Sequence, residues 1–327
     1  MSGGGRRGRI GQEQIILAIA VMVFVVFSLL VPGFLSAGNV VAMVQSVSVL
    51  GILGLGMAIT ILGRGIDLSM VASMSVAIAW MLVQLNAGVP LAQALPMAIG
   101  FSVLVGIING VLVAYVEIPP IFATLAMGVT VYGFGKFFLV ESDVNFLPDG
   151  WRWLADLAAT RPLGVPVPVI VFLACAGLAH LALRYLRDGR FVYAMGDNPV
   201  AARTAGVPVR VMMVLQYVIS ALIALLAGLL MSMLVASMNT RIASGTLVYD
   251  VILVVVLGGI SLSGGRGGIS SVVVGTLLIG IMLNGMTLLN LTYTAQNVIK
   301  AMILLLALIL DTIINPRDEQ TAQQGDI

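Results

Sequence analysis

The sequence predicts an all-α integral membrane protein with about ten transmembrane helices and with both termini in the cytoplasm. Two features of the composition support this fold class. Hydrophobic residues make up 60% of the 327 residues and charged residues only 9%, whereas soluble domains carry about 25% charged residues. The apolar residues also gather into runs of roughly 20, which is the length that an α-helix needs to cross a bilayer.

Apolar runs with short connections fill one transmembrane domain, 15–314. In order, the predicted spans are 15–32, 43–62, 68–86, 93–115, 121–140, 166–184, 211–233, 248–262, 269–289 and 296–314. The flanking segments 1–14 and 315–327 are predicted cytoplasmic tails. The first run is longer than the apolar core of a signal peptide, and no small-residue cleavage site follows it, so we expect it to be retained.

The arginines predict the orientation of these spans. With the N-terminus inside, eleven arginines fall in cytoplasmic connections and only three, Arg152, Arg161 and Arg241, in external ones. This excess satisfies the positive-inside rule. The longest cytoplasmic connection is then 185–210, and the longest external one is 141–165.

Two places in this scheme fit more than one structure. The turn at Arg64 fits a cytoplasmic turn and a re-entrant or broken helix equally well, and the short run 248–262 fits a span and a re-entrant or broken helix equally well. In addition, GIDLS at 65–69 aligns without a gap with GISLS at 259–263, and both follow an apolar run of the same direction. This match suggests a parallel internal repeat, as some transporters have.

The connection 185–210 contains a short helix whose two ends are marked by the sequence. Asn198 is a favourable N-cap, and Pro199 stands at the first helical position. Gly206 suits the left-handed position after a helix, and Pro208 prevents continuation. The predicted helix, 199–205, is too short to be stable alone, so we expect it to contact another protein.

No motif in the sequence predicts catalysis, a metal site or a cofactor. Lys136 and Lys300 are the only lysines and neither precedes Ser or Thr, so a Walker A loop is absent. Both lie near predicted external span ends, where they can snorkel to the headgroups. The sequence has one histidine, His180, and one cysteine, Cys175, and these two residues are too few to form a zinc cluster. We therefore expect a protein that is not an enzyme.

Polar residues at membrane depth are costly, so they are the candidates for function. Asp67, with Ser69 beside it, is either a cap for the third span, paired with Arg64, or part of a substrate path. Asn109 and Asn284 either line that path or form interhelical hydrogen bonds. We assign Asp67, Ser69, Asn109 and Asn284 to the substrate path and keep the structural alternatives open.

Four segments of the chain stand out together: GIDLS at 65–69, IPPIFATLAM at 118–127, GRFVYAMGDNPVAARTAGV at 189–207 and VVVLGGISLSGGRGG at 254–268. In combination they resemble the permease subunit of ribose-type ABC importers. Their order and spacing match from about residue 40 to the last span. The resemblance implies a bacterial inner-membrane protein that pairs with a second permease subunit, most simply as a homodimer. It also implies a periplasmic sugar-binding protein and a separate cytoplasmic ATPase.

The resemblance further implies that the cytoplasmic loop seats in a groove of the ATPase. This chain matches the family pattern G-x-N-x-x-A-A-R-x-x-G, and the coupling residues are expected to be Gly196, Asn198, Pro199, Ala201, Ala202, Arg203 and Gly206. The chain departs from the family at Pro199 and Val200, where relatives often have acidic or polar residues, and at Arg64, where relatives often have glycine.

The predicted function is ATP-driven import of a neutral monosaccharide, which can be a pentose, a hexose or a related polyol. The expected mechanism is alternating access, in which the ATPase moves the coupling helix and the spans reorient. The alternative is an ion-coupled secondary transporter of a small neutral solute. That alternative needs titratable groups at the midplane, and Asp67 is the sequence's one candidate.

Overall fold

The computed structural model describes residues 12–314, which form thirteen α-helices with short connecting elements. Ten of these helices correspond to the predicted spans, with ends shifted by at most six residues. They are α1 (Gln12–Leu30), α2 (Ala37–Leu62), α3 (Met70–Asn86), α4 (Leu91–Ala114), α5 (Pro120–Phe134), α7 (Val167–Tyr185), α10 (Val209–Val235), α11 (Leu247–Gly258), α12 (Ile269–Leu288) and α13 (Tyr293–Ile314). Residues 1–11 and the predicted tail 315–327 lie outside the described part of the chain.

Six helices of the described chain are long and apolar enough to cross a membrane: α2, α4, α5 with the π-helical turn Gly135–Leu139 that extends it, α7, α10 and α12. The apolar helices α1, α3, α11 and α13 are shorter by the same measure. The helical fold class is thus confirmed. The run 248–262 becomes α11, whose 12 residues span only about 18 Å, so this helix alone is too short for a bilayer core of about 30 Å.

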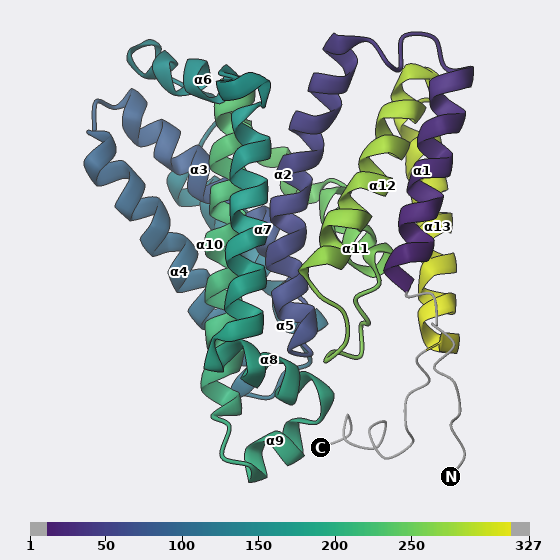
Figure 1. The fold of residues 1–327 in the computed structure, drawn as a ribbon. Coiled ribbons are helices and arrows are strands. Elements are labelled where there is room, and N and C mark those ends of the chain that lie inside the picture. The colour runs from purple at the N-terminus through teal and green to yellow at the C-terminus, as the bar shows by residue number, and fades with distance from the viewer. Residues whose placement is uncertain (1–11, 315–327) are drawn as a thin grey trace, which may run out of the picture.

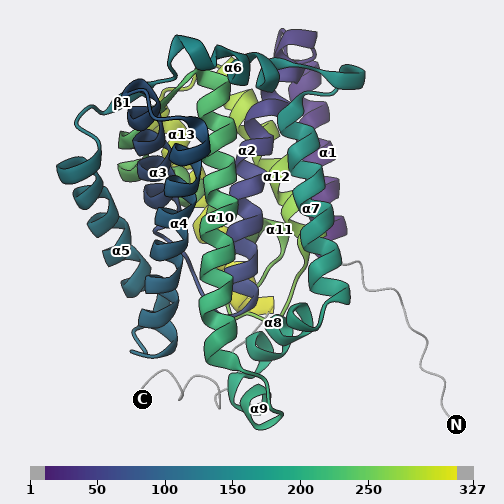
Figure 2. The ribbon, with the colours of Figure 1, turned by 90° about the vertical axis from the view of Figure 1, so that its left-hand side faces the viewer.

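Three further helices lie in the connections and mark the two ends of the molecule. α6 (Arg152–Ala159) covers one end, and α8 (Arg187–Asp197) and α9 (Pro199–Thr204) lie at the other (Figures 1 and 2). In Figure 1 α1 begins and α13 ends on the side of the molecule that is nearer to α8 and α9, with the start of α1 close to mid-height.

The structure adds a small antiparallel ribbon that the sequence did not predict. β1 (Val144–Phe146) pairs with β2 (Ser237–Asn239). Beside it, Asp143 contacts the Lys136 ammonium at 2.9 Å and the Arg241 guanidinium at 2.7 Å. The hydrogen bond from Lys136, followed by the one from Arg241, lowers the pKa of the Asp143 carboxyl despite some opposing desolvation. These contacts tie the connection 141–165 to the segment after α10.

α10 lies at the centre of the bundle, with α2, α3 and α4 packed around it (Figure 2). Its contact with α4 depends on two glycines spaced four apart, which lets the helix backbones approach closely. A Cβ added to Gly106 would lie 2.7 Å from Val218 Cα, and one added to Gly110 would lie 2.5 Å from Val214 Cα.

The α4–α10 contact leads to a stability prediction. Gly110→Ala is expected to lower the free energy of unfolding by about 1–3 kcal/mol, because the new methyl group overlaps the α10 backbone. Gly100→Ala on the same helix is the matched control, since no atom lies within 4 Å of its added Cβ. It should leave stability unchanged or raise it, because alanine favours a helix. Thermal unfolding in detergent measures both variants; equal effects would contradict the assigned close contact.

The turn at Arg64 is a buried break between two helices. α2 ends at Leu62 and α3 begins at Met70, and between them Gly65, Asp67 and Ser69 are all buried. The break thus lies inside the bundle, as the broken-helix alternative requires.

Candidate functional site

The predicted short helix is present, and its cap is the one that the sequence indicates. α9 runs over Pro199–Thr204, and the Asn198 side-chain oxygen accepts hydrogen bonds of 3.0 Å from both Val200 N and Ala201 N. Pro199 occupies the first turn, Ala205 is the C-cap, and Gly206 follows with a φ of 84°. The residues of the connection therefore build α9 through local interactions.

α9 presents most of its surface to the surroundings. Ala202 is buried against the bundle, whereas Ala201, Arg203 and Gly206 are exposed. Val200 is 50% exposed. Figure 2 shows α9 as the outermost element at its end of the molecule. The helix thus forms a small, fixed projection with an arginine on it.

α8 connects this projection to the break between α2 and α3. Arg64 crosses from the break to the last carbonyls of α8: its Nε donates to Gly196 O and its Nη2 to Asp197 O, both at 2.8 Å. Helix C-termini carry unpaired carbonyls with partial negative charge, so a guanidinium is a fitting partner. Gly196 is buried directly against the Leu62 carbonyl, where any side chain would overlap it.

The glycine-rich segment after α11 lies against the same place. Gly265 N donates to Leu62 O at 2.9 Å. The hydroxyl of Tyr193, on α8, donates to Gly267 O at 3.0 Å. The two segments that suggested a repeat are 65–69 and 259–263. The residues next to them along the chain, Leu62 and Gly265, contact each other, and both places also contact α8.

Three of the four predicted path residues lie together next to the break. The Asp67 carboxylate accepts hydrogen bonds from Ser69 Oγ at 2.7 Å and Ser69 N at 3.1 Å through one oxygen. Its other oxygen accepts from Ser220 Oγ of α10 at 2.9 Å. Asn109 Nδ2, on α4, donates to Ser69 Oγ at 2.7 Å. This polar cluster, Asp67, Ser69, Asn109 and Ser220, links the break to α4 and α10.

The polar cluster is enclosed by protein in this conformation. Asp67 and Ser69 are 1% exposed, and Asn109 and Ser220 are 0% exposed, so no open path reaches them within this chain. Asp67 forms no ion pair with Arg64, which binds α8 instead. Their assignment to a substrate path stays a prediction.

Asn284 lies apart from the other three. It exchanges two amide hydrogen bonds with Asn39, at 2.8 and 2.9 Å, and so joins α12 to α2. This reciprocal pair is the interhelical bonding that the sequence left open as the alternative. The pair satisfies one donor and one acceptor on each amide.

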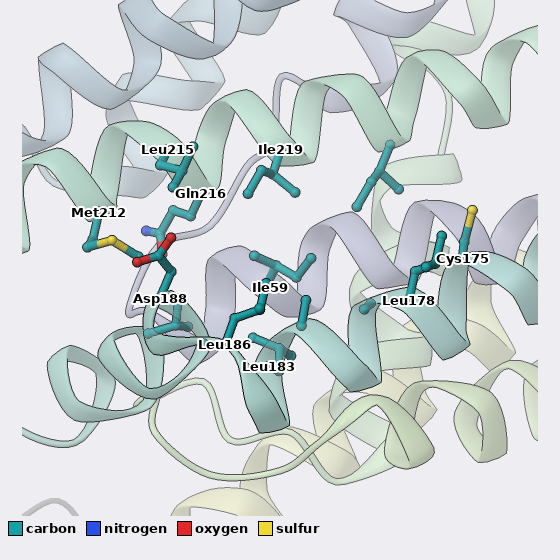
Figure 3. A pocket seen from close by; sticks show the side chains of 15 residues that line it. Ile59, Cys175, Leu178, Leu183, Leu186, Asp188, Met212, Leu215, Gln216 and Ile219 are labelled. Carbon is teal, nitrogen blue, oxygen red and sulfur yellow. The ribbon is translucent and has the colours of Figure 1, made fainter.

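A cavity of about 360 Å³ opens between α7 and α10, with Ile59 of α2 and Asp188 of α8 also lining it. Figure 3 shows side chains from these helices projecting into it, among them Cys175, the one cysteine of the chain. Nearly all of the lining is apolar. The exception at depth is Gln216, which is 2% exposed and has no hydrogen-bond partner for either amide atom. A lone glutamine inside the run 211–233 was the available sequence signal for this residue.

The unpaired amide of Gln216 leads to a second stability prediction. Gln216→Met keeps the side-chain volume and removes a buried polar group without partners, whose cost is about 1–3 kcal/mol. We expect the Tm in detergent to rise by about 2 °C or more. Gln93→Met, at an exposed position of α4, should leave the Tm unchanged. A lower Tm for Gln216→Met would show that the amide has a bound partner in solution.

The prediction that Lys300 snorkels to the headgroups is wrong, because its side chain is buried in an ion pair. Its ammonium lies 2.7 and 2.9 Å from the two carboxylate oxygens of Asp250, and the two side chains are only 9% and 12% exposed. The pair joins α13 to α11. The sequence did not reveal this pair, because Asp250 and Lys300 lie 50 positions apart along the chain.

These features define a class of protein before any comparison. Apolar helices of membrane-spanning length carry a fixed, exposed helix, α9, at one end, and α8 connects that helix to the buried break between two spans. In the described part of the chain, no three His, Cys, Asp or Glu residues are grouped to hold a metal ion. The arrangement is that of a helical membrane protein with an exposed contact point for another protein at one end.

Comparison with known proteins identifies the family. A family model described as "Branched-chain amino acid transport system / permease component" matches residues 39–308. The ribose import permease of Escherichia coli (strain K12) is 34% identical over 310 residues, which cover 92% of this chain and 93% of that protein. The L-arabinose transport system permease of the same strain is 31% identical over 312 residues, covering 93% and 92%. No solved structure gives a significant match.

The chain therefore belongs to this permease family. It is a multi-pass membrane permease of a bacterial ABC importer and is not itself catalytic. The family implies an ATPase and a binding protein as partners.

Proposed function

We propose that this permease imports a neutral monosaccharide, which a periplasmic binding protein delivers and a cytoplasmic ATPase drives across the inner membrane. The observation that carries the proposal is the capped, exposed α9, joined through α8 to the buried break at Arg64. Such a helix offers an ATPase a rigid contact whose movement reaches the spans. The coupling residues are Gly196, Asn198, Pro199, Ala201, Ala202, Arg203 and Gly206.

The sugar substrate is inferred from the names of individual relatives, and these names differ from the substrate in the family's description. That description names branched-chain amino acids, whereas full-length relatives at 31–34% identity are named for ribose, galactofuranose and L-arabinose. The ionisable groups inside the bundle also suit a neutral solute. Asp67 is buried and hydrogen-bonded to the hydroxyl groups of Ser69 and Ser220, and Asp250 is paired with Lys300, so neither carboxylate is open to a solute in this conformation.

The same proposal sets the orientation and assembly. α8, α9 and both termini face the cytoplasm, in agreement with the arginine distribution, and α6 within the connection 141–165 faces the binding protein. Two copies of the permease form a homodimer, with the sugar path between or within them. Asp67, Ser69 and Asn109 border that path when the break at Arg64 changes shape, and Asn284 is the less favoured member because it pairs with Asn39.

Uptake by proteoliposomes tests the function. The chain is reconstituted with its ATPase, and the binding protein is added outside together with labelled D-ribose, L-arabinose, galactose or leucine. We expect uptake of a sugar that requires ATP and the binding protein, and none of leucine. Uptake of leucine without uptake of any sugar would show that the substrate is an amino acid. Uptake driven by a proton or sodium gradient without ATP would support the ion-coupled alternative and overturn the proposal.

A further inference from the structure

Backbones of three segments far apart in the sequence touch at one point beside the end of α2. The segments are the end of α2 and the break, the end of α8, and the glycine-rich loop between α11 and α12. We call the contact the glycine junction and define it as Leu62, Arg64, Gly196, Gly264 and Gly265. Gly265 N donates to Leu62 O at 2.9 Å, and Gly196 lies against the same carbonyl.

The glycine junction has no room for side chains. A Cβ on Gly196 would overlap Leu62 O, one on Gly264 would lie 2.7 Å from Arg64 Cγ, and one on Gly265 would lie 2.7 Å from Asp197 N. Gly264 and Gly265 also have φ values of 84° and 70°, which other residues rarely adopt. Because the three backbones are in direct contact, none of them can shift far without moving the other two.

Arg64 is the side chain that binds this contact together. Its backbone takes a left-handed conformation, φ 65°, which is strained for any residue with a Cβ and persists only where surrounding contacts hold it. Those contacts include the two hydrogen bonds to Gly196 O and Asp197 O at the end of α8. A guanidinium presents its donors in a rigid fork, so it holds two carbonyls at once where an ammonium does not.

The glycine junction is connected onward to the spans by two routes. Along the chain, the break leads from Arg64 to Asp67 and Ser69, which bond to α4 through Asn109 and to α10 through Ser220. The glycine-rich loop leads directly into α12, and the Tyr193 hydroxyl holds that loop to α8 through Gly267 O. Movement of α8 and α9 therefore reaches α4 and α10 by the first route and α12 by the second.

We propose that the glycine junction, with Arg64 as its positioning residue, transmits movement of α8 and α9 to α3 and α12 at the same time. This inference rests on the proposed function, since it assumes that an ATPase moves α9. It assigns a role to Arg64, whose guanidinium links the break to the two last carbonyls of α8.

The test uses the assembled transporter in proteoliposomes with three readouts: ATPase copurification, basal ATP hydrolysis, and stimulation of hydrolysis and uptake by the sugar-loaded binding protein. Arg64→Ala is expected to retain copurification and basal hydrolysis and to lose stimulation and uptake by roughly tenfold, which is within the usual range of coupling between linked sites. Arg64→Lys should recover only part of the loss, because lysine lacks the fork. Arg190→Ala, on the exposed side of α8, is the control and should behave as the wild type.

Different outcomes separate this inference from the proposed function. Wild-type-like stimulation and uptake in Arg64→Ala would overturn the glycine junction while the importer stands. Loss of ATPase copurification in Arg64→Ala would also overturn it, because Arg64 would then only maintain the docking surface. A wild type without ATP-dependent sugar uptake would defeat the proposed function itself. If Arg64→Ala does not reach the membrane, Arg64→Lys and Tyr193→Phe decide the question by the same readouts. Arg64→Lys removes the fork that holds two carbonyls, and Tyr193→Phe removes the hydroxyl group that joins α8 to the loop beside the junction.

Discussion

Lys300→Met is expected to lower the free energy of unfolding by about 3–5 kcal/mol, because it leaves the buried Asp250 carboxylate without its partner. Both side chains of the pair are nearly enclosed between α11 and α13, and an uncompensated charge there has no water to solvate it. The ion pair is one of the contacts that attach the short helix α11 to α13, beside the hydrogen bonds of Thr246 with Tyr293 and Asn297. The measurement is thermal unfolding of the purified permease in detergent.

Two further variants show whether the effect comes from the unpaired charge. Lys300→Met combined with Asp250→Leu should recover a large part of the loss, since an apolar pair replaces the ion pair. Lys136→Met is the matched control, because Lys136 also pairs with an aspartate but with side chains 24% and 32% exposed. Its cost should stay below about 1 kcal/mol. A double variant as unstable as Lys300→Met would contradict the assigned pairing.

Arg203→Glu is expected to abolish copurification of the ATPase while membrane insertion continues. Arg203 is exposed on α9, so reversing its charge leaves the permease fold intact. Arginine is enriched among the few residues that dominate protein interfaces, and a loss of at least about 2 kcal/mol, roughly 30-fold in affinity, is the usual size of such an effect. Pull-down of the ATPase from solubilised membranes, with permease yield as the reference, measures the result.

The controls for this prediction lie in the same connection. Arg190→Glu makes the same charge change at an exposed position of α8 and should retain the ATPase. Asn198→Ala removes the two hydrogen bonds that cap α9, at a cost of about 1 kcal/mol, and should weaken binding to an intermediate degree. Equal copurification by wild type and Arg203→Glu would remove α9 from the ATPase interface.

Local patterns account for the parts of the structure that were predictable. The capping of α9 involves Asn198 and the next three residues, so it is legible in the sequence. Each predicted apolar run is a helix in the structure. This too was predictable from local sequence, because the length of an apolar run indicates whether a helix can cross a bilayer. The largest error in a helix start is also local: α2 begins at Ala37, where Ser36 caps it by accepting from Asn39 N at 3.4 Å, and not at residue 43.

The sequence alone thus determined the membrane class, the helices and the capped α9, whereas only the tertiary structure decided which polar groups meet. Arg64 was considered a partner for Asp67 but binds Gly196 and Asp197, more than 130 positions away along the chain. Lys300 likewise meets Asp250 on another helix. The physical reason lies in the bilayer. Lipid suits an apolar helix face as well as a protein neighbour does, so the apolar pattern does not reveal which face is buried or against what.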